Sequence, residues 1–276
     1  MRRRRLATML VRLREEAGKT PDQAAEQIGC HRSKISRIEN AHLGISVGEL
    51  RALLAFYEVT DPEYVEGLVG LARRSRERGW VQRLWNDLPS YADHIDYEQT
   101  ADYIRSFQPL LISGLFQTGD YARALYRANP AMLGDDEIDR LVDVRMQRQT
   151  VLEGEQAPRI CLIEGEAALR SNVGSARVMV PQLEHLLALA ERPNVELQVL
   201  PLSAGAHPGL TGAFVVFGFP NPAFSDVVTV EHPTGTLYME TTEETSTYTL
   251  TFDSLRSVAM SPAASRDLIQ RIKQGL

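Results

Sequence analysis

The sequence is poor in cysteine and has no long apolar run. Its 276 residues include only two cysteines, Cys30 and Cys161, which are far apart in the chain. Neither a disulfide framework nor a cysteine-based metal site is therefore indicated. No stretch of about eighteen apolar residues occurs, so no membrane-spanning helix is predicted. The apolar run after Arg5 is short and lacks a small-residue cleavage site, so we predict no export signal and a cytoplasmic protein.

The common motifs of catalysis and phosphate binding are also missing. The chain has no Gly-rich phosphate loop, no Gly-x-Ser-x-Gly elbow and no His-Glu-x-x-His pair. The best case for catalysis rests on His207 in the segment AGAHPG, with three possible acid–base partners, His232, Glu164 and Glu166. Phospholipase-D-like chemistry would need a lysine two residues after the histidine, and no lysine lies between Lys34 and Lys273. We therefore predict a protein that is not an enzyme and needs no cofactor.

Charge is distributed unevenly along the chain. Its net charge is −6, yet residues 1–56 contain eleven Arg and Lys against six Asp and Glu, a net of +5. Residues 57–276 contain nineteen against thirty, a net of −11. A basic head on an acidic body is typical of a nucleic-acid reader joined to a module with another task. The length allows two domains, each with its own core.

The most informative stretch is 20–40, TPDQAAEQIGCHRSKISRIEN. Its apolar spacing predicts two short helices joined by a tight turn. Four positions shape the junction, because Ala25 lets the helices approach, Gly29 can take a positive φ, and Ile35 and Ile38 close the wedge. The outer face of the second helix then carries six hydrogen-bond donors: Arg32, Ser33, Lys34, Ser36, Arg37 and Asn40.

Such a donor face suits base edges and phosphate oxygens of a DNA duplex, although a short cationic face can also be merely solvated. By its four junction positions and the phrase SKISRIE, the stretch resembles the helix-turn-helix of the lambda-repressor/Cro-like, or XRE, regulators. The resemblance implies base reading by Arg32, Ser33 and Arg37, backbone contact by Asn40, and a salt bridge between Arg14 and Glu39. We assign Lys34, Ser36 and His42 to the DNA backbone as well. The stretch departs from the family at Pro21, which replaces a glutamine that braces the backbone.

The flanks of this stretch complete a predicted domain over residues 1–72. A cationic run, Arg2, Arg3, Arg4 and Arg5, precedes the first predicted helix and is either a solvated terminus or an arm that contacts the DNA backbone. Further helices are predicted to begin after Ser46, with Glu49 completing a capping box, and at Pro62. An arginine-rich segment over 73–94 is interpreted as a linker.

Residues 95–276 predict a second domain in two parts. Over 95–157 the apolar spacing favours helices, including one with Tyr97, Ala101, Ile104 and Phe107 on one face. Over 158–276 helices alternate with short β-prone runs at 160–163, 195–200, 213–219, 227–230 and 236–239. The expected fold class is thus a mainly α helix-turn-helix bundle plus a C-terminal α+β or α/β domain with a mixed sheet.

This second domain carries a resemblance of its own. Its phrases GLFQT and YARA over 114–124, and the segments 145–149, 164–170 and 204–209, resemble the C-terminal domain of the WhiJ-like regulators of actinobacteria. The chain departs from that family at Ser113 and Phe116, where Pro and Leu are usual. The resemblance implies a transcriptional regulator with a small partner protein of the BldB-like or toxin-like type encoded nearby. We regard His207, Gln117 and Arg123 as candidates for the ligand or partner region.

Together these patterns predict a sequence-specific regulator of double-stranded DNA that acts as a homodimer, with no membrane partner. The second domain is predicted to dimerise and to bind the small partner protein, as an antitoxin-like regulator does. Two alternatives stay open: this domain senses a small-molecule ligand, or it has hydrolase activity. Its aromatic residues fit either a ligand pocket or an ordinary core.

Overall fold

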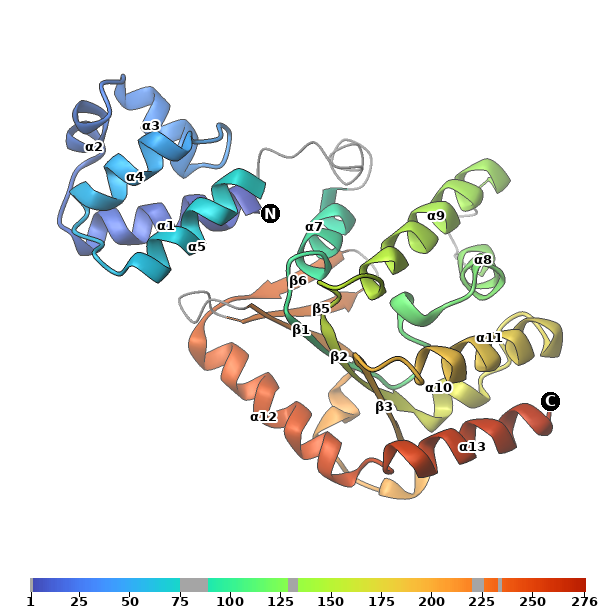
Figure 1. Ribbon diagram of the computed structural model, residues 1–276. Helices are drawn as coiled ribbons and strands as arrows, with labels where there is room; N and C mark the ends of the chain where they lie inside the picture. The colour runs from blue at the N-terminus through green and yellow to red at the C-terminus, as the bar shows by residue number, and fades with distance from the viewer. Residues whose placement is uncertain (1, 75–88, 129–133, 220–225, 233–234) are drawn as a thin grey trace. The chain divides into compact units, whose positions relative to one another are not determined.

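The computed structural model describes residues 2–74, 89–128, 134–219, 226–232 and 235–276 (Figure 1). Its contacts divide the chain into two compact units, with the boundary between Tyr97 and Glu98. Within the described residues, neither unit has a helix that is long and apolar enough to cross a bilayer. Most of the predicted linker, at 75–88, lies outside the described residues.

The first unit contains the predicted bundle of five helices. They are α1 Arg2–Glu16, α2 Pro21–Gln27, α3 Arg32–Glu39, α4 Val47–Phe56 and α5 Pro62–Arg74, and α7 Pro89–Glu98 follows. Helix α1 begins at Arg2, so the backbone of the cationic run is helical and is not an arm ahead of the helix. Arginine has a high helix propensity, which explains why the helix extends through this run.

Local capping signals fix where these helices begin. The Thr20 hydroxyl accepts from the Gln23 backbone N–H at 3.2 Å, and the Gln23 amide oxygen accepts from the Thr20 N–H at 2.8 Å. Ser46 and Glu49 form the predicted second capping box. Pro21 occupies the first helical position, where its missing N–H costs nothing. The helices bury a common apolar core that includes Leu10, Leu13, Ile35, Ile38, Leu50, Leu53, Leu54 and Leu68.

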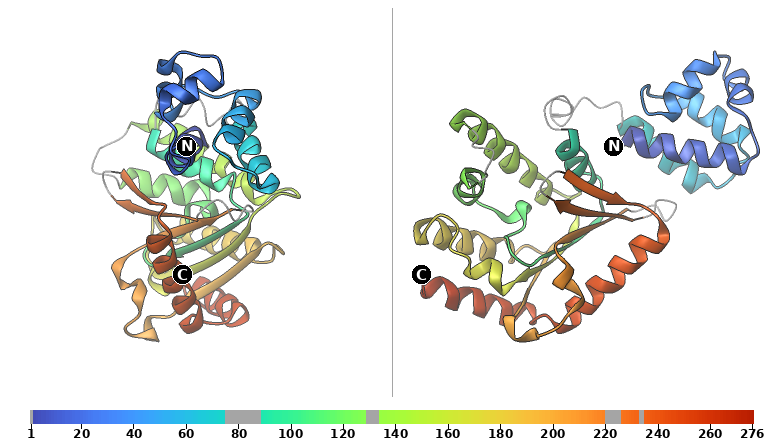
Figure 2. Two further views of the ribbon diagram at one scale, coloured as in Figure 1. Left: turned by 90° about the vertical axis from the view of Figure 1, so that its left-hand side faces the viewer. Right: turned by 180° about the vertical axis from the view of Figure 1, so that it is seen from behind.

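The second unit is built on a six-stranded mixed sheet in the order β3-β2-β1-β4-β5-β6 (Figures 1 and 2). The strands are β1 Tyr103–Gln108, β2 Arg159–Gly165, β3 Val195–Leu200, β4 Phe214–Gly218, β5 Val227–His232 and β6 Gly235–Met239. The first three are parallel, and the last three join them as an antiparallel extension. The mixed sheet and its antiparallel later strands are therefore confirmed.

Helices cover both faces of this sheet (Figures 1 and 2). They are α8 Gly119–Arg127, α9 Asp135–Arg148, α10 Glu166–Arg170, α11 Ala176–Leu189, α12 Thr242–Val258 and α13 Pro262–Gln274. Helix α12 packs on one face, where its Phe252 and Leu255 join a core with Phe107, Phe214 and Val216. Helices α10 and α11 lie on the other side of the sheet. The short 3-10 helices are η1 Gly114–Phe116, η2 Gln149–Leu152, η3 Leu202–Ala204 and η4 Pro208–Thr211.

The predicted helix through Ile104 and Phe107 is wrong, because both residues belong to strand β1. They lie three residues apart and therefore point to opposite faces of the strand. Both are buried, at 2% and 0% exposure, since β1 lies between β2 and β4 in a sheet covered on both sides. A central strand that is buried on both faces does not show the alternation of polar and apolar residues by which strands are identified. In β1 the apolar residues are three positions apart, which is also the spacing on one face of a helix.

Candidate functional site

The helix-turn-helix wedge has the geometry that its sequence predicts. Gly29 has a φ of 62°, and α2 ends just before it. Ala25, Ile35 and Ile38 are all buried, at 4%, 1% and 3% exposure. Because these side chains fill the space between α2 and α3, the second helix is held at a fixed angle with one face left to solvent.

A salt bridge fixes the end of α3 to α1. The Arg14 guanidinium donates from Nε to Oε1 of Glu39 at 2.7 Å and from Nη2 to Oε2 at 3.3 Å. Its Nη1 also donates to the Lys19 carbonyl at 3.0 Å, and Arg14 is only 8% exposed. The hydrogen bond to Glu39 raises the pKa of Arg14. The interaction implied by the XRE resemblance is therefore present and joins two helices that are distant in sequence.

The outward face of α3 is exposed at Arg32, Ser33, Ser36, Arg37 and Asn40. Within the described part of the chain, the Arg37 guanidinium has no ion-pair partner. Arg32 Nη1 lies 3.6 Å from Asp22 Oδ2, and both side chains are about two-thirds exposed, at 64% and 66%. Such an exposed pair is worth little, so both guanidinium groups can approach a ligand.

The other residues predicted to contact the DNA backbone differ in whether their polar groups already have partners within the protein. Lys34 is paired with Glu49 of α4, so its ammonium group is directed toward that helix. Hydrogen bonds from Lys34 and Ser46 lower the pKa of Glu49 to about 2. The Asn40 amide donates to the Ser36 carbonyl at 2.7 Å and caps α3, and His42 is exposed. Their contact with DNA stays a prediction.

Sequence reasoning missed His31, which caps α3. Its ring Nδ1 accepts from the Ser33 backbone N–H at 3.4 Å and lies 3.2 Å from the Ser33 hydroxyl. The cap ties the proposed base reader Ser33 to the turn. Histidine is not among the preferred capping residues, so its position directly before Arg32 was the only available signal.

Two candidates in the second unit hold its own framework together. Gln117 is only 2% exposed, donates to the Ile112 carbonyl at 2.6 Å and accepts from Arg145 Nη1 at 2.9 Å. Arg123 of α8 is paired with Asp139 of α9. Both side chains are engaged in the contacts that position α8, α9 and the loop after β1.

The third candidate, His207, lies in the loop that follows β3. Its ring meets Phe107 edge-on, with the centroids 6.2 Å apart. Its Nδ1 is buried without a hydrogen-bond partner among the described residues. Glu166, one of its possible acid–base partners, accepts from Arg170 Nε at 2.7 Å and from the Leu202 backbone N–H at 2.9 Å.

Glu164 has a carboxyl group whose environment differs strongly from water. It is fully buried near the end of β2, and its Oε1 accepts from the Ser113 backbone N–H at 2.8 Å. Its Oε2 has no partner among the described residues. Burial raises the pKa of Glu164 to about 8. Across the described ranges, no group of three or more His, Cys, Asp and Glu side chains could hold a metal ion.

Glu164→Gln should flatten the pH dependence of stability of the second unit. Below about pH 4.5 the carboxyl is protonated whether the chain is folded or unfolded, so its contribution is fully present. Between about pH 4.5 and about pH 8 the carboxyl is protonated in the folded state but ionised in the unfolded state. The free energy of unfolding therefore falls as the pH rises through this range, by at most about 1.4 kcal/mol per pH unit. Hydrogen exchange of β1 and β2 at several pH values measures this. The same slope in the variant would contradict the assignment.

Comparisons with known proteins cover most of the chain. Residues 5–66 match the model of a helix-turn-helix domain. Residues 91–271 match the model of a domain of unknown function, DUF5753. No curated protein and no solved structure matches the chain. The first match agrees with the wedge formed by α2 and α3, and the second assigns no activity to the sheet.

Proposed function

Since the chain belongs to the DUF5753 family, whose defining domain has no known function, we propose its role from the helix-turn-helix domain that precedes it. The helix-turn-helix domain indicates a DNA-binding regulator. We propose an XRE-type transcriptional regulator that reads DNA sequence through α3. The observation that carries this proposal is the exposed row Arg32, Ser33 and Arg37 on a helix fixed to α1 by Arg14 and Glu39.

The chemistry of this face fits the major groove. Guanidinium groups donate two parallel hydrogen bonds to guanine, and a serine hydroxyl can bond either a base or a phosphate. Ser36, Asn40 and His42 lie exposed on or just after α3 and would contact the backbone, which sets register without reading sequence. A homodimer would place two copies of α3 in successive major grooves, about one helical turn apart.

For the second unit we propose binding and not catalysis, in a cytoplasmic protein. The WhiJ-like phrases support a dimerising unit with a small partner protein of the BldB-like or toxin-like type. Exposed leucines in the loops after β1 and β3 support a docking role: Leu110, Leu202 and Leu210 are 67%, 66% and 70% exposed. Burying such large apolar side chains against a partner would stabilise a complex.

A second candidate function is ligand sensing by the same unit. The observation that favours it is a cavity of about 640 Å³ lined by β1, β2 and β3 together with residues around α12 and α13. Its volume is that of a typical small-molecule site. A sensor would bind its ligand in isolation and change its affinity for DNA when loaded.

Selection from a random duplex library tests the DNA-binding proposal. The full chain should enrich a defined site at low salt. On that site Arg32→Ala should lose about 1–3 kcal/mol and relax discrimination at one base pair, because a base-edge contact carries sequence information. The matched control is Arg12→Ala, which removes an exposed arginine of α1 that pairs with Glu16 at 3.4 Å.

The outcomes separate the possible roles of this arginine. Equal weakening on every sequence would assign Arg32 to phosphate. Equal effects of Arg32→Ala and Arg12→Ala on DNA affinity would show that α3 does not lie in the DNA interface. If the full chain enriched no duplex, the proposal of sequence-specific DNA binding would be contradicted.

A further inference from the structure

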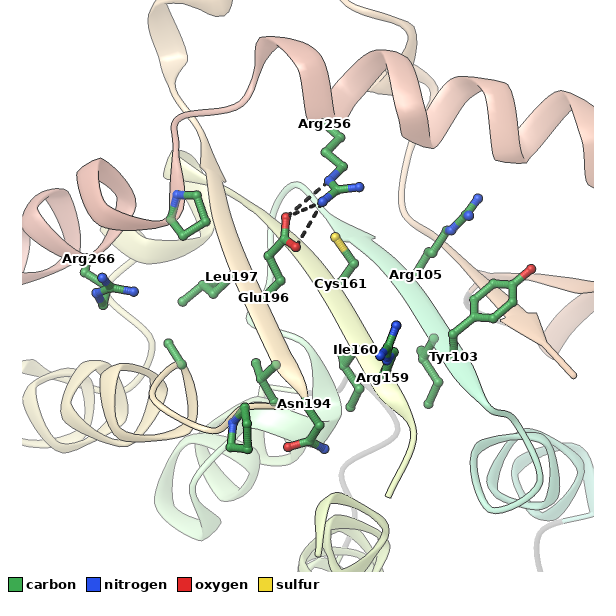
Figure 3. A pocket seen from close by; sticks show the side chains of 15 residues that line it. Tyr103, Arg105, Arg159, Ile160, Cys161, Asn194, Glu196, Leu197, Arg256 and Arg266 are labelled. Carbon is green, nitrogen blue, oxygen red and sulfur yellow. Dashed lines mark hydrogen bonds and ion pairs between the residues drawn. The ribbon is translucent and has the colours of Figure 1, made fainter. Parts of the chain in front are cut away.

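The second unit has a cavity that the DNA-binding role does not use. It opens on the sheet face that α12 covers, at the ends of β1, β2 and β3 where these parallel strands begin. Figure 3 shows Glu196 and Cys161 near its centre, with Arg266 on one side and Arg105 on the other. We name it the arginine cavity after the four arginines in its lining: Arg105, Arg159, Arg256 and Arg266.

The charge of this lining is unusual for this part of the chain. The four arginines come from four different elements, β1, β2, α12 and α13. Glu196 is the single carboxylate among the lining residues. Residues 57–276 have an excess of eleven negative charges, so average composition would not gather four arginines around one hollow. Bringing like charges together costs free energy, and a bound anion lowers this cost.

One of these arginines is already neutralised within the lining. Arg256 Nη2 donates to both carboxylate oxygens of Glu196, at 2.7 and 2.9 Å (Figure 3). The hydrogen bond to Glu196 raises the pKa of Arg256. This pair accounts for the single acid of the lining. Arg105 faces Asp253 from outside the lining, so Arg159 and Arg266 are the two cations left for other partners.

Arg105 is held in place but incompletely satisfied. Its guanidinium lies 5.1 Å from the centroid of the Tyr103 ring. Its Nη1 is buried and has no hydrogen-bond partner in the described structure, and Asp253 Oδ1 lies 3.9 Å away, too far for a hydrogen bond. A buried donor without an acceptor costs free energy, so Arg105 adds an incompletely satisfied positive charge to the cavity wall.

Arg159 and Arg266 are the most available cations of the cavity. Both are exposed, and neither side chain has a partner in the described part of the chain. Two acids lie just outside the lining, but each faces another lining residue, since Asp226 accepts from the Tyr103 hydroxyl and Asp253 faces Arg105. Two free guanidinium groups on separate elements can hold two separate anionic groups.

We propose that the arginine cavity binds a small organic molecule with at least two phosphate or carboxylate groups. Arg159 and Arg266 hold one group each, and Arg105 adds positive charge from the wall of the cavity. A single inorganic ion would leave most of the 640 Å³ empty, so the ligand includes an organic body. The proposal goes beyond DNA binding by α3 and gives the sensing function a site and a ligand class.

Calorimetric titration of the full chain with inorganic pyrophosphate and with citrate tests the site without DNA. One probe ion per chain should bind at low salt, and the stronger of the two identifies the phosphate or the carboxylate class. Arg159→Ala and Arg266→Ala should each weaken binding by about tenfold or more, because a charge-assisted hydrogen bond is lost. Both residues are exposed, so the variants should stay folded, which their thermal unfolding verifies.

Arg271→Ala is the matched control, because Arg271 is also an exposed arginine of α13 but does not line the cavity. It should bind both probes as the unmodified chain does. Absence of binding at millimolar probe concentration would overturn the proposal. Equal weakening by Arg266→Ala and Arg271→Ala would also overturn it, since it would reveal only non-specific attraction. Either result would leave DNA selection by α3 unaffected.

Discussion

Replacing Arg148 by methionine is expected to lower the free energy of unfolding of the second unit by about 3–5 kcal/mol. Arg148 lies at the end of α9 and donates to Glu98 from Nη2 at 2.6 Å and from Nε at 2.9 Å. The two side chains are only 4% and 3% exposed. Methionine would fill much of the volume but would remove the Arg148 guanidinium from a buried carboxylate in a site of low dielectric constant.

The double variant Arg148→Met/Glu98→Leu should recover most of this loss. Removing both charges also removes their desolvation cost, and apolar side chains of similar size can occupy the same space. Denaturant unfolding of the full chain, followed through the transition of the second unit, measures both effects. Arg127→Met is the control, because its pair with Asp135 is 59% and 79% exposed and should contribute about 0.5 kcal/mol or less. A double variant as unstable as the single one would show that packing, and not charge, is decisive.

The helix-turn-helix unit could be predicted from sequence because its signals are local. Gly29 and the wedge residues lie within fourteen positions of one another, and each capping box spans four residues. Helices of this size are defined by contacts three and four residues apart, so a linear pattern contains most of the information. The strands from β2 to β6 were similarly visible as short β-prone runs bounded by turn residues.

Features that depend on distant contacts could not be predicted in this way. Strand β1 pairs with β2 and β4, which follow it by about fifty and more than one hundred residues, and only this central position buries both of its faces. The arginine cavity joins residues from 103 to 266. No spacing rule connects positions so far apart, because their proximity arises from the order of strands in the sheet.

The ion-pair or hydrogen-bond partner of a side chain could also not be predicted from the sequence. In the sequence Lys34 is equivalent to the other donors of α3, yet its ammonium group forms an ion pair with Glu49 of α4. Gln117 looked available to a ligand, yet a backbone carbonyl and Arg145 occupy both ends of its amide. Residue type specifies how many hydrogen bonds a group can make, and the tertiary structure decides which groups form them.

The largest expected effect on DNA binding comes from a residue that need not touch DNA. Replacing Arg14 by methionine should destabilise the helix-turn-helix bundle by about 3 kcal/mol, because Glu39 would keep its charge in a site where it is 11% exposed. A bundle of this size has a small core and a stability of only a few kcal/mol. The variant should therefore lose DNA binding on every sequence.

Rescue separates this positioning role from a direct contact. The double variant Arg14→Met/Glu39→Met leaves no unpaired charge in the buried site, and the other acid near Arg14, Glu15, is 66% exposed, so folding and DNA binding should both return. Arg37→Ala should do the opposite, with unchanged thermal unfolding and weakened binding, since Arg37 is exposed and has no ion-pair partner among the described residues. If the double variant folds but still fails to bind the selected duplex, Arg14 itself contacts DNA. In that case the binding surface would extend from α3 onto α1, because Arg14 belongs to α1.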